Sequence, residues 1–114
     1  MKTVSTNKTA KAVAFLSQAI EANGFIFVSG QVHADKNWQL VGSSPQEKFG
    51  VSMENVRHIL DVANCLTENI VKAISEVYAQ YFGDILPARE AIGVTALPLG
   101  ATIEVSLITA KGQQ

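Results

Sequence analysis

Cysteine and histidine, the residues that most often crosslink small domains or bind metals, are scarce in this sequence. The 114 residues include one Cys and two His. A single cysteine cannot form an internal disulfide, and so few soft ligands cannot complete the tetrahedral set of a structural zinc site. We therefore expect neither a disulfide nor a metal site, and we interpret Cys65 as a buried thiol more readily than as a nucleophile.

An excess of either charge is also missing. Nine Lys and Arg stand against ten Asp and Glu, for a net charge of -1. Generic nucleic-acid binding needs a basic field, so we do not expect a nucleic-acid partner. No apolar run approaches the roughly 20 residues of a membrane span, and residues 1–10 lack the apolar stretch of a signal peptide. We expect a cytoplasmic protein without a membrane partner.

Apolar residues are plentiful instead. They make up 47% of the chain, and charged residues only 17%. This supports one domain over residues 1–114 with a real core, in which residues 1–10 form a loose polar arm. The low charge content also indicates that some surface is buried against other subunits.

The first half of the chain predicts a hairpin followed by a helix. Asn23-Gly24 is typical of a tight turn between strands. Ser44 can cap a helix, Pro45 suits its first position, and Glu47 completes a capping box. The expected elements are strands over 12–20 and 25–28, an interruption at 29–31, a loop over 32–37, a short strand over 38–41 and a helix from 45 to about 63.

The second half predicts a helix and then two strands. Apolar residues share one helical face from about residue 69 to Gly83, and Pro87 prevents continuation. Strands are expected over 91–96 and 102–109, joined by residues 97–100. The order of strands, two helices and strands predicts an α+β domain with both helices on one face of the sheet.

Two charged residues are candidates for chemistry. Arg89 lies where a loop becomes a strand, and its planar fork suits a carboxylate or phosphate, although a surface pair with Glu90 explains it as well. Glu104 alternates with apolar neighbours, so it either faces solvent or lines a cleft where it positions water. The segment Ser29–Gly30 offers backbone groups to a ligand, or is an ordinary turn.

Three stretches together resemble the Rid family, also called YjgF or L-PSP. The most specific is a Pro-Ala-Arg motif followed by Leu-Pro-x-Gly-Ala and a strand that carries a glutamate. The stretches keep the family's order and span most of the chain. They comprise residues 16–20 with 23–31, residues 76–82, and residues 87–89 with 96–101 and 103–105.

The resemblance implies a mixed sheet with two helices on one face, similar to chorismate mutase, assembled as a barrel-like homotrimer with clefts between subunits. It also implies an enzyme that hydrolyses 2-imino acids, such as 2-iminobutanoate and 2-iminopropanoate, to 2-keto acids and ammonia. Members of the family need no metal or organic cofactor.

The family's functional residues map onto this chain by motif. Arg89 would bind the substrate carboxylate, and the backbone at Ala91 would add a hydrogen bond. Glu104 would position the attacking water, and the Ser29–Gly30 segment would line the cleft. Leu16 stands where active members usually carry a cleft tyrosine.

A second departure is the short connection between the two helices. Only residues 65–73 intervene, which is little for a strand and its linker. A truncated strand, a lost strand and an omitted segment all explain this spacing. A non-catalytic module that binds small carboxylates or a protein is therefore the alternative function. RNA cleavage is less favoured, because the chain has no basic groove.

Overall fold

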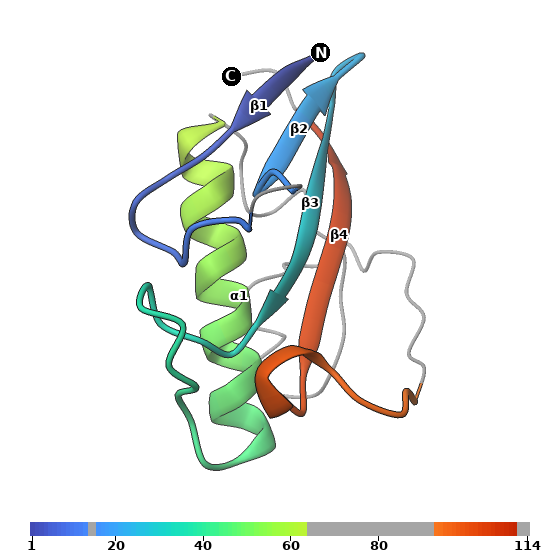
Figure 1. Cartoon of the computed structure of the whole chain (residues 1–114). Coiled ribbons are helices and arrows are strands. Elements are labelled where there is room, and N and C mark those ends of the chain that lie inside the picture. The colour runs from blue at the N-terminus through green and yellow to red at the C-terminus, as the bar shows by residue number, and fades with distance from the viewer. Residues whose placement is uncertain (14–15, 64–92, 112–114) are drawn as a thin grey trace.

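The computed structural model describes residues 1–13, 16–63 and 93–111. They form an α+β fold in which one helix covers one face of a four-stranded sheet (Figure 1). Among the described residues the strand order is β1-β2-β3-β4 and every pair is antiparallel, and the expected mixed sheet stays a prediction for the rest of the chain. The elements are β1 (Lys2–Val4), β2 (Ala19–Ala22), β3 (Phe25–Val32), α1 (Pro45–Val62), a 3-10 turn η2 (Pro98–Gly100) and β4 (Glu104–Ala110).

The expected hairpin is confirmed at the turn between β2 and β3. Asn23 and Gly24 both have positive φ, at 52° and 79°. Two-residue hairpin turns require this backbone conformation, which Asn and Gly tolerate better than other residues. Lys111 closes the same end, since its backbone N–H donates to the Gly24 carbonyl at 2.7 Å and its ammonium pairs with Glu21 at 3.2 Å. The first strand of the hairpin is shorter than expected, because it begins only at Ala19.

The N-terminal segment, where we expected a loose arm, contributes a short strand to the sheet. Lys2–Val4 pairs with β2, and Val4 belongs to the core. The buried Gln18 amide holds the following residues, accepting from the Thr6 N–H at 2.7 Å and donating to the Thr9 hydroxyl at 3.0 Å. A strand of three residues is too short to show alternation, so its partner on β2 decides its conformation.

Helix α1 begins and ends where the sequence predicts. The Ser44 hydroxyl accepts from the Glu47 N–H at 3.1 Å. The Glu47 carboxylate turns back to the N–H and hydroxyl of Ser43, both at 3.0 Å, one residue earlier than in a standard capping box. The inner face of the helix packs on β3 and β4 through Phe49, Met53, Val56, Ile59 and Leu60.

Strand β3 separates an inner face from an outer face. Ile26 and Val28 are buried under α1, whereas Phe25 and Phe27 point the other way and are exposed. This alternation is the two-residue period of a half-buried strand. In the part of the chain that the structure describes, no helix has the length and apolarity of a membrane span.

Some of the predicted elements fall partly or wholly outside the described residues. The second helix and the connection at 65–73 lie outside the described residues. The strand expected over 91–96 is described only from Gly93 onward, and there the chain is irregular. Gly93 offers no side chain to pack in a sheet, which is consistent with the absence of a strand at this point.

Candidate functional site

Strand β3 carries an irregularity at the segment that we expected to interrupt it. Val28 pairs with Leu107, but the next pair joins Gln31 to Val105, so two residues of β3 face one of β4. A bulge of this kind bends a strand and redirects its side chains. Ser29 and Gly30 therefore lie within a strand and not in a loop.

The bulge is fixed to the neighbouring segment by Ser29. Its N–H donates to the Gln18 carbonyl at 3.0 Å, and its hydroxyl donates to the Ser17 carbonyl at 2.6 Å. These bonds commit the hydroxyl hydrogen to the fold, but they leave the oxygen able to accept a further bond.

The Glu104 carboxyl group rests directly against Gly30. A Cβ atom built on Gly30 would overlap the Glu104 Oε1 and Cδ atoms. Only a glycine permits this close approach of a side chain to the backbone. Of the two interpretations of Glu104, the structure thus gives a position over the bulge, where the side chain is still accessible to solvent.

A cavity of about 370 Å³ opens at this point. It brings together Leu16, Ser29, Gly30 and Glu104, four of the residues proposed from the sequence. The other predicted site residues, Arg89 and Ala91, lie outside the described residues. Further lining comes from Ala10, Ala12, Val13, Ser17, Gln18, Gln31, Val32, Trp38, Pro98 and Leu99.

Trp38 and Leu99 line the cavity although sequence reasoning did not select them. Both have a left-handed backbone, with φ of 63° and 62°. Bulky residues avoid this region, so neither conformation follows from residue type. The one local signal is the Leu-Pro-x-Gly motif, which predicts a turn at residue 99 without predicting what the leucine faces.

His33 joins the two loops that carry these residues. It is 2% exposed. Its Nε2 accepts from the Thr102 N–H at 3.1 Å, and its Nδ1 lies 3.0 Å from the Val41 carbonyl oxygen. Because a carbonyl can only accept, this pattern assigns the proton to Nδ1. His33 therefore holds the 33–41 loop against the segment that leads into β4.

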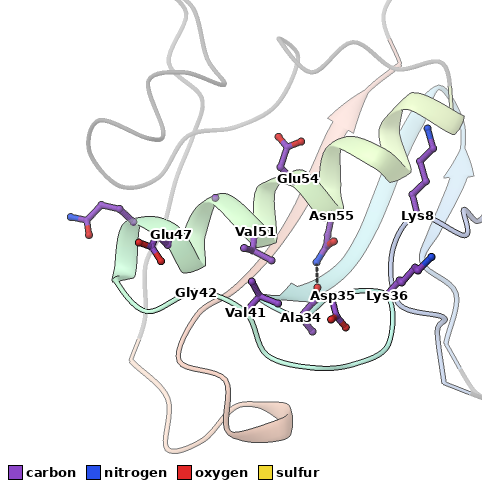
Figure 2. A pocket seen from close by; sticks show the side chains of 12 residues that line it. Lys8, Ala34, Asp35, Lys36, Val41, Gly42, Glu47, Val51, Glu54 and Asn55 are labelled. Carbon is purple, nitrogen blue, oxygen red and sulfur yellow. Dashed lines mark hydrogen bonds between the residues drawn. The ribbon is translucent and has the colours of Figure 1, made fainter.

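A second and wider opening, of about 820 Å³, lies between α1 and the 34–42 segment (Figure 2). Asn55 points from the helix to this segment and donates to the carbonyls of Ala34 at 2.9 Å and Val32 at 3.2 Å. Both hydrogens of the Asn55 side-chain amide are thus donated to backbone carbonyls. Charged residues of both signs, Lys8, Asp35, Lys36, Glu47 and Glu54, surround the opening.

No metal site accompanies either opening within residues 1–13, 16–63 and 93–111, where no three His, Cys, Asp or Glu side chains cluster. The smaller cavity has the apolar lining and the few convergent polar groups that small-molecule sites share. We therefore take it as the candidate site.

The chain matches a known family and its members over nearly its whole length. The family described as Endoribonuclease L-PSP matches residues 6–111. A mouse protein named 2-iminobutanoate/2-iminopropanoate deaminase is 35% identical, with 97% of this chain and 92% of that protein covered. A RutC family protein of Aquifex aeolicus is 34% identical, with 97% of this chain and all of that protein covered.

Solved structures of related proteins superpose closely on this chain. A putative endoribonuclease of Thermotoga maritima superposes with a TM-score of 0.89 at 32% identity, covering 99% of both chains. Yeast Mmf1 does so with a TM-score of 0.87 at 34% identity, covering 97% of this chain and 98% of that one. The alignment with the mouse protein has 124 positions, so this chain of 114 residues lacks some residues that the relative carries. The chain belongs to the Endoribonuclease L-PSP family, the Rid or YjgF family that its motifs resemble.

Proposed function

We propose that the protein hydrolyses 2-imino acids to 2-keto acids and ammonia. Water adds to the imine carbon, the carbon–nitrogen bond breaks, and the nitrogen leaves as ammonia while the oxygen remains as the keto group. The observation that carries the proposal is the Glu104 carboxyl group resting on Gly30 inside the cavity. Several relatives at about this level of identity are named 2-iminobutanoate/2-iminopropanoate deaminase, which supports the reaction.

Glu104 would act as the base of this reaction. An imine carbon is electrophilic once its nitrogen is protonated, so the protein has to hold the substrate, orient water and move protons. A carboxylate held against glycine backbone is well placed to accept a proton from water. The Ser29 oxygen, whose hydrogen is already donated to Ser17, can accept a hydrogen bond from the imine N–H or from the water.

Arg89 and Ala91 would complete the site. In this proposal the Arg89 guanidinium binds the substrate carboxylate in a charge-assisted pair, and the Ala91 backbone adds a hydrogen bond. Both assignments rest on the Pro-Ala-Arg motif. We further propose that the protein acts as a homotrimer in the cytoplasm, with the site between subunits.

Leu16 gives the site an apolar wall where a tyrosine hydroxyl would otherwise stand. It lines the cavity and is 56% exposed. Because leucine neither donates nor accepts a hydrogen bond, Glu104 is the one titratable group among the described lining residues, and the Ser29 oxygen adds a hydrogen-bond acceptor.

An imine assay tests the proposal. With 2-iminopropanoate or 2-iminobutanoate generated in situ by an amino-acid oxidase, we expect the purified protein to accelerate loss of the imine. We expect Arg89→Ala to lower kcat/KM by roughly a hundredfold, because the substrate loses its orientation. The matched control is Arg57→Ala, since Arg57 pairs with Glu54 and Asp61 on α1, away from the cavity.

No acceleration over buffer would refute the deaminase proposal, and full activity of the Arg89 variant would refute the carboxylate clamp. Calorimetry distinguishes the alternative function. Saturable binding of 2-keto acids without turnover would identify a binding module on the same site.

A further inference from the structure

Exposed apolar side chains gather around the candidate cavity. Val13, Leu16, Trp38 and Leu99 all line it, and each is at least 40% exposed. Single exposed apolar residues need no explanation, but a group of them around one cavity marks a binding surface. Such a lining favours an apolar part of a ligand, while Glu104 and Ser29 serve its polar part.

The backbone of two of these residues is strained. Among the described residues, positive φ outside glycine occurs at Asn23, Trp38 and Leu99. Asn23 is explained by its hairpin turn. Trp38 and Leu99 are bulky residues for which this conformation is unfavourable, and both meet at the cavity. Strain of this kind persists only where the surrounding structure imposes it, and it is concentrated at functional sites.

Asp35 imposes the conformation of Trp38. Its carboxylate accepts from the N–H groups of Asn37 at 2.8 Å and Gln39 at 3.0 Å. Its carbonyl accepts from the Trp38 N–H at 3.0 Å, and its own N–H donates to the Gln39 carbonyl at 2.9 Å. Four hydrogen bonds made by Asp35 thus close the turn that carries the Trp38 indole.

The turn around Leu99 is fixed in a similar way. The Gly100 N–H donates to the Leu97 carbonyl at 3.3 Å, and the Ala101 N–H donates to the Pro98 carbonyl at 3.0 Å. His33 then ties this segment, through Thr102, to the loop that carries Trp38. The two apolar residues are therefore presented by connected and braced loops, which is the property of a preorganised contact.

We propose that the cavity accepts the side chain of a bulky apolar 2-imino acid, branched or aromatic, and that Trp38 and Leu99 determine this specificity. The inference rests on the proposed function and names its substrate class. A volume of about 370 Å³ lies in the range that holds drug-sized ligands, so the described part of the cavity has room for a side chain larger than the methyl group of 2-iminopropanoate. A larger apolar group would displace water from Trp38, Leu99 and Leu16.

The selectivity is measured with a series of imines. We generate the imines of alanine, leucine and phenylalanine with an amino-acid oxidase and compare kcat/KM. We expect the leucine or phenylalanine imine to exceed the alanine imine by at least about tenfold, since each methylene in an apolar pocket is worth about that factor. Trp38→Ala and Leu99→Ala should each lower this ratio by about tenfold.

The matched control is Leu40→Ala. Leu40 is 41% exposed and belongs to the same loop as Trp38, but it does not line the cavity. This variant should keep the ratio. Equal kcat/KM for all three imines, or an unchanged ratio in both cavity variants, overturns the specificity proposal while the deaminase proposal stands.

Tryptophan fluorescence keeps the inference testable if no imine is hydrolysed. Trp38 is the one tryptophan of the chain, so its emission reports on this cavity without labels. We expect 4-methyl-2-oxopentanoate to change the emission in a saturable manner, with at least about tenfold tighter binding than pyruvate. Binding of this kind without turnover would overturn the deaminase proposal alone. Equal binding, or no saturable change, would overturn the apolar pocket.

Discussion

At the scale of single residues, the site depends on Gly30, which has no Cβ atom. Without a Cβ at this position, the Glu104 carboxyl group can rest on the bulge of β3. Any other residue at position 30 would push the Glu104 carboxyl group away. The atoms that meet the added Cβ belong to the far end of a flexible side chain, so Glu104 can turn aside at little cost to the fold.

We therefore expect Gly30→Ala to reduce kcat by roughly a hundredfold, the range attributed to a positioned base, while the melting temperature changes little. Imine hydrolysis and thermal unfolding, measured on the same preparation, check this separation. Gly93→Ala is the matched control, because a Cβ at Gly93 meets no atom of the described residues within 4 Å. Full activity of the Gly30 variant would show that Glu104 does not act from this position.

At the scale of elements, the start of α1 is stabilised by a titratable group. Hydrogen bonds from the Ser43 backbone N–H, and then from the Ser43 hydroxyl, lower the pKa of Glu47 below its usual 4.5. A lowered pKa in the folded state means that the ionised carboxylate stabilises the helix. This contribution is present above the unfolded pKa and is lost as the pH falls through the folded pKa.

We expect Glu47→Gln to be less stable than the wild type at pH 7, and the difference to shrink as the pH falls below about 4.5. Urea unfolding at a series of pH values measures it. Ser44→Ala serves as the comparison, because its hydroxyl does not titrate and its loss should cost about 1 kcal/mol at every pH. A difference for Glu47→Gln that does not vary with pH would contradict this account.

At the scale of the whole molecule, the outer face of the sheet carries exposed apolar side chains in the part of the chain that the structure describes. Phe25, Phe27 and Ile108 lie on this face and are exposed. The two phenylalanine rings lie 6.4 Å apart, and Phe27 pairs with Ile108 across β3 and β4. Contiguous exposed apolar residues mark an interaction surface, and the low charge content of the chain agrees with one.

We predict that this face forms the interface of the proposed trimer. Phe27→Asp should give a smaller particle in sedimentation, and activity should fall with it because the proposed site lies between subunits. Val62→Asp is the control, since Val62 is 49% exposed at the end of α1. A wild-type monomer, or a Phe27 variant with unchanged mass, would contradict the prediction.

Some features of this protein follow from residues close together in the sequence. Ser44, Pro45 and Glu47 predict where α1 begins, and Asn23-Gly24 predicts the hairpin turn. Alternation of apolar and polar residues over 102–109 predicts β4. Each signal acts within a turn or two of the chain, so no distant partner is needed to detect it. The motifs around Arg89 and Glu104 likewise indicated the family.

Tertiary structure decided the rest. Strand β1 exists because β2 pairs with it, and β3 continues through Ser29–Gly30 because β4 supports it across the bulge. The cavity joins residues from the N-terminal third of the chain to residues near its end. Trp38 and Leu99, which line it, adopt backbone conformations that their residue types disfavour. Local preference could not predict these features, because the contacts that stabilise them form only when segments far apart in sequence meet.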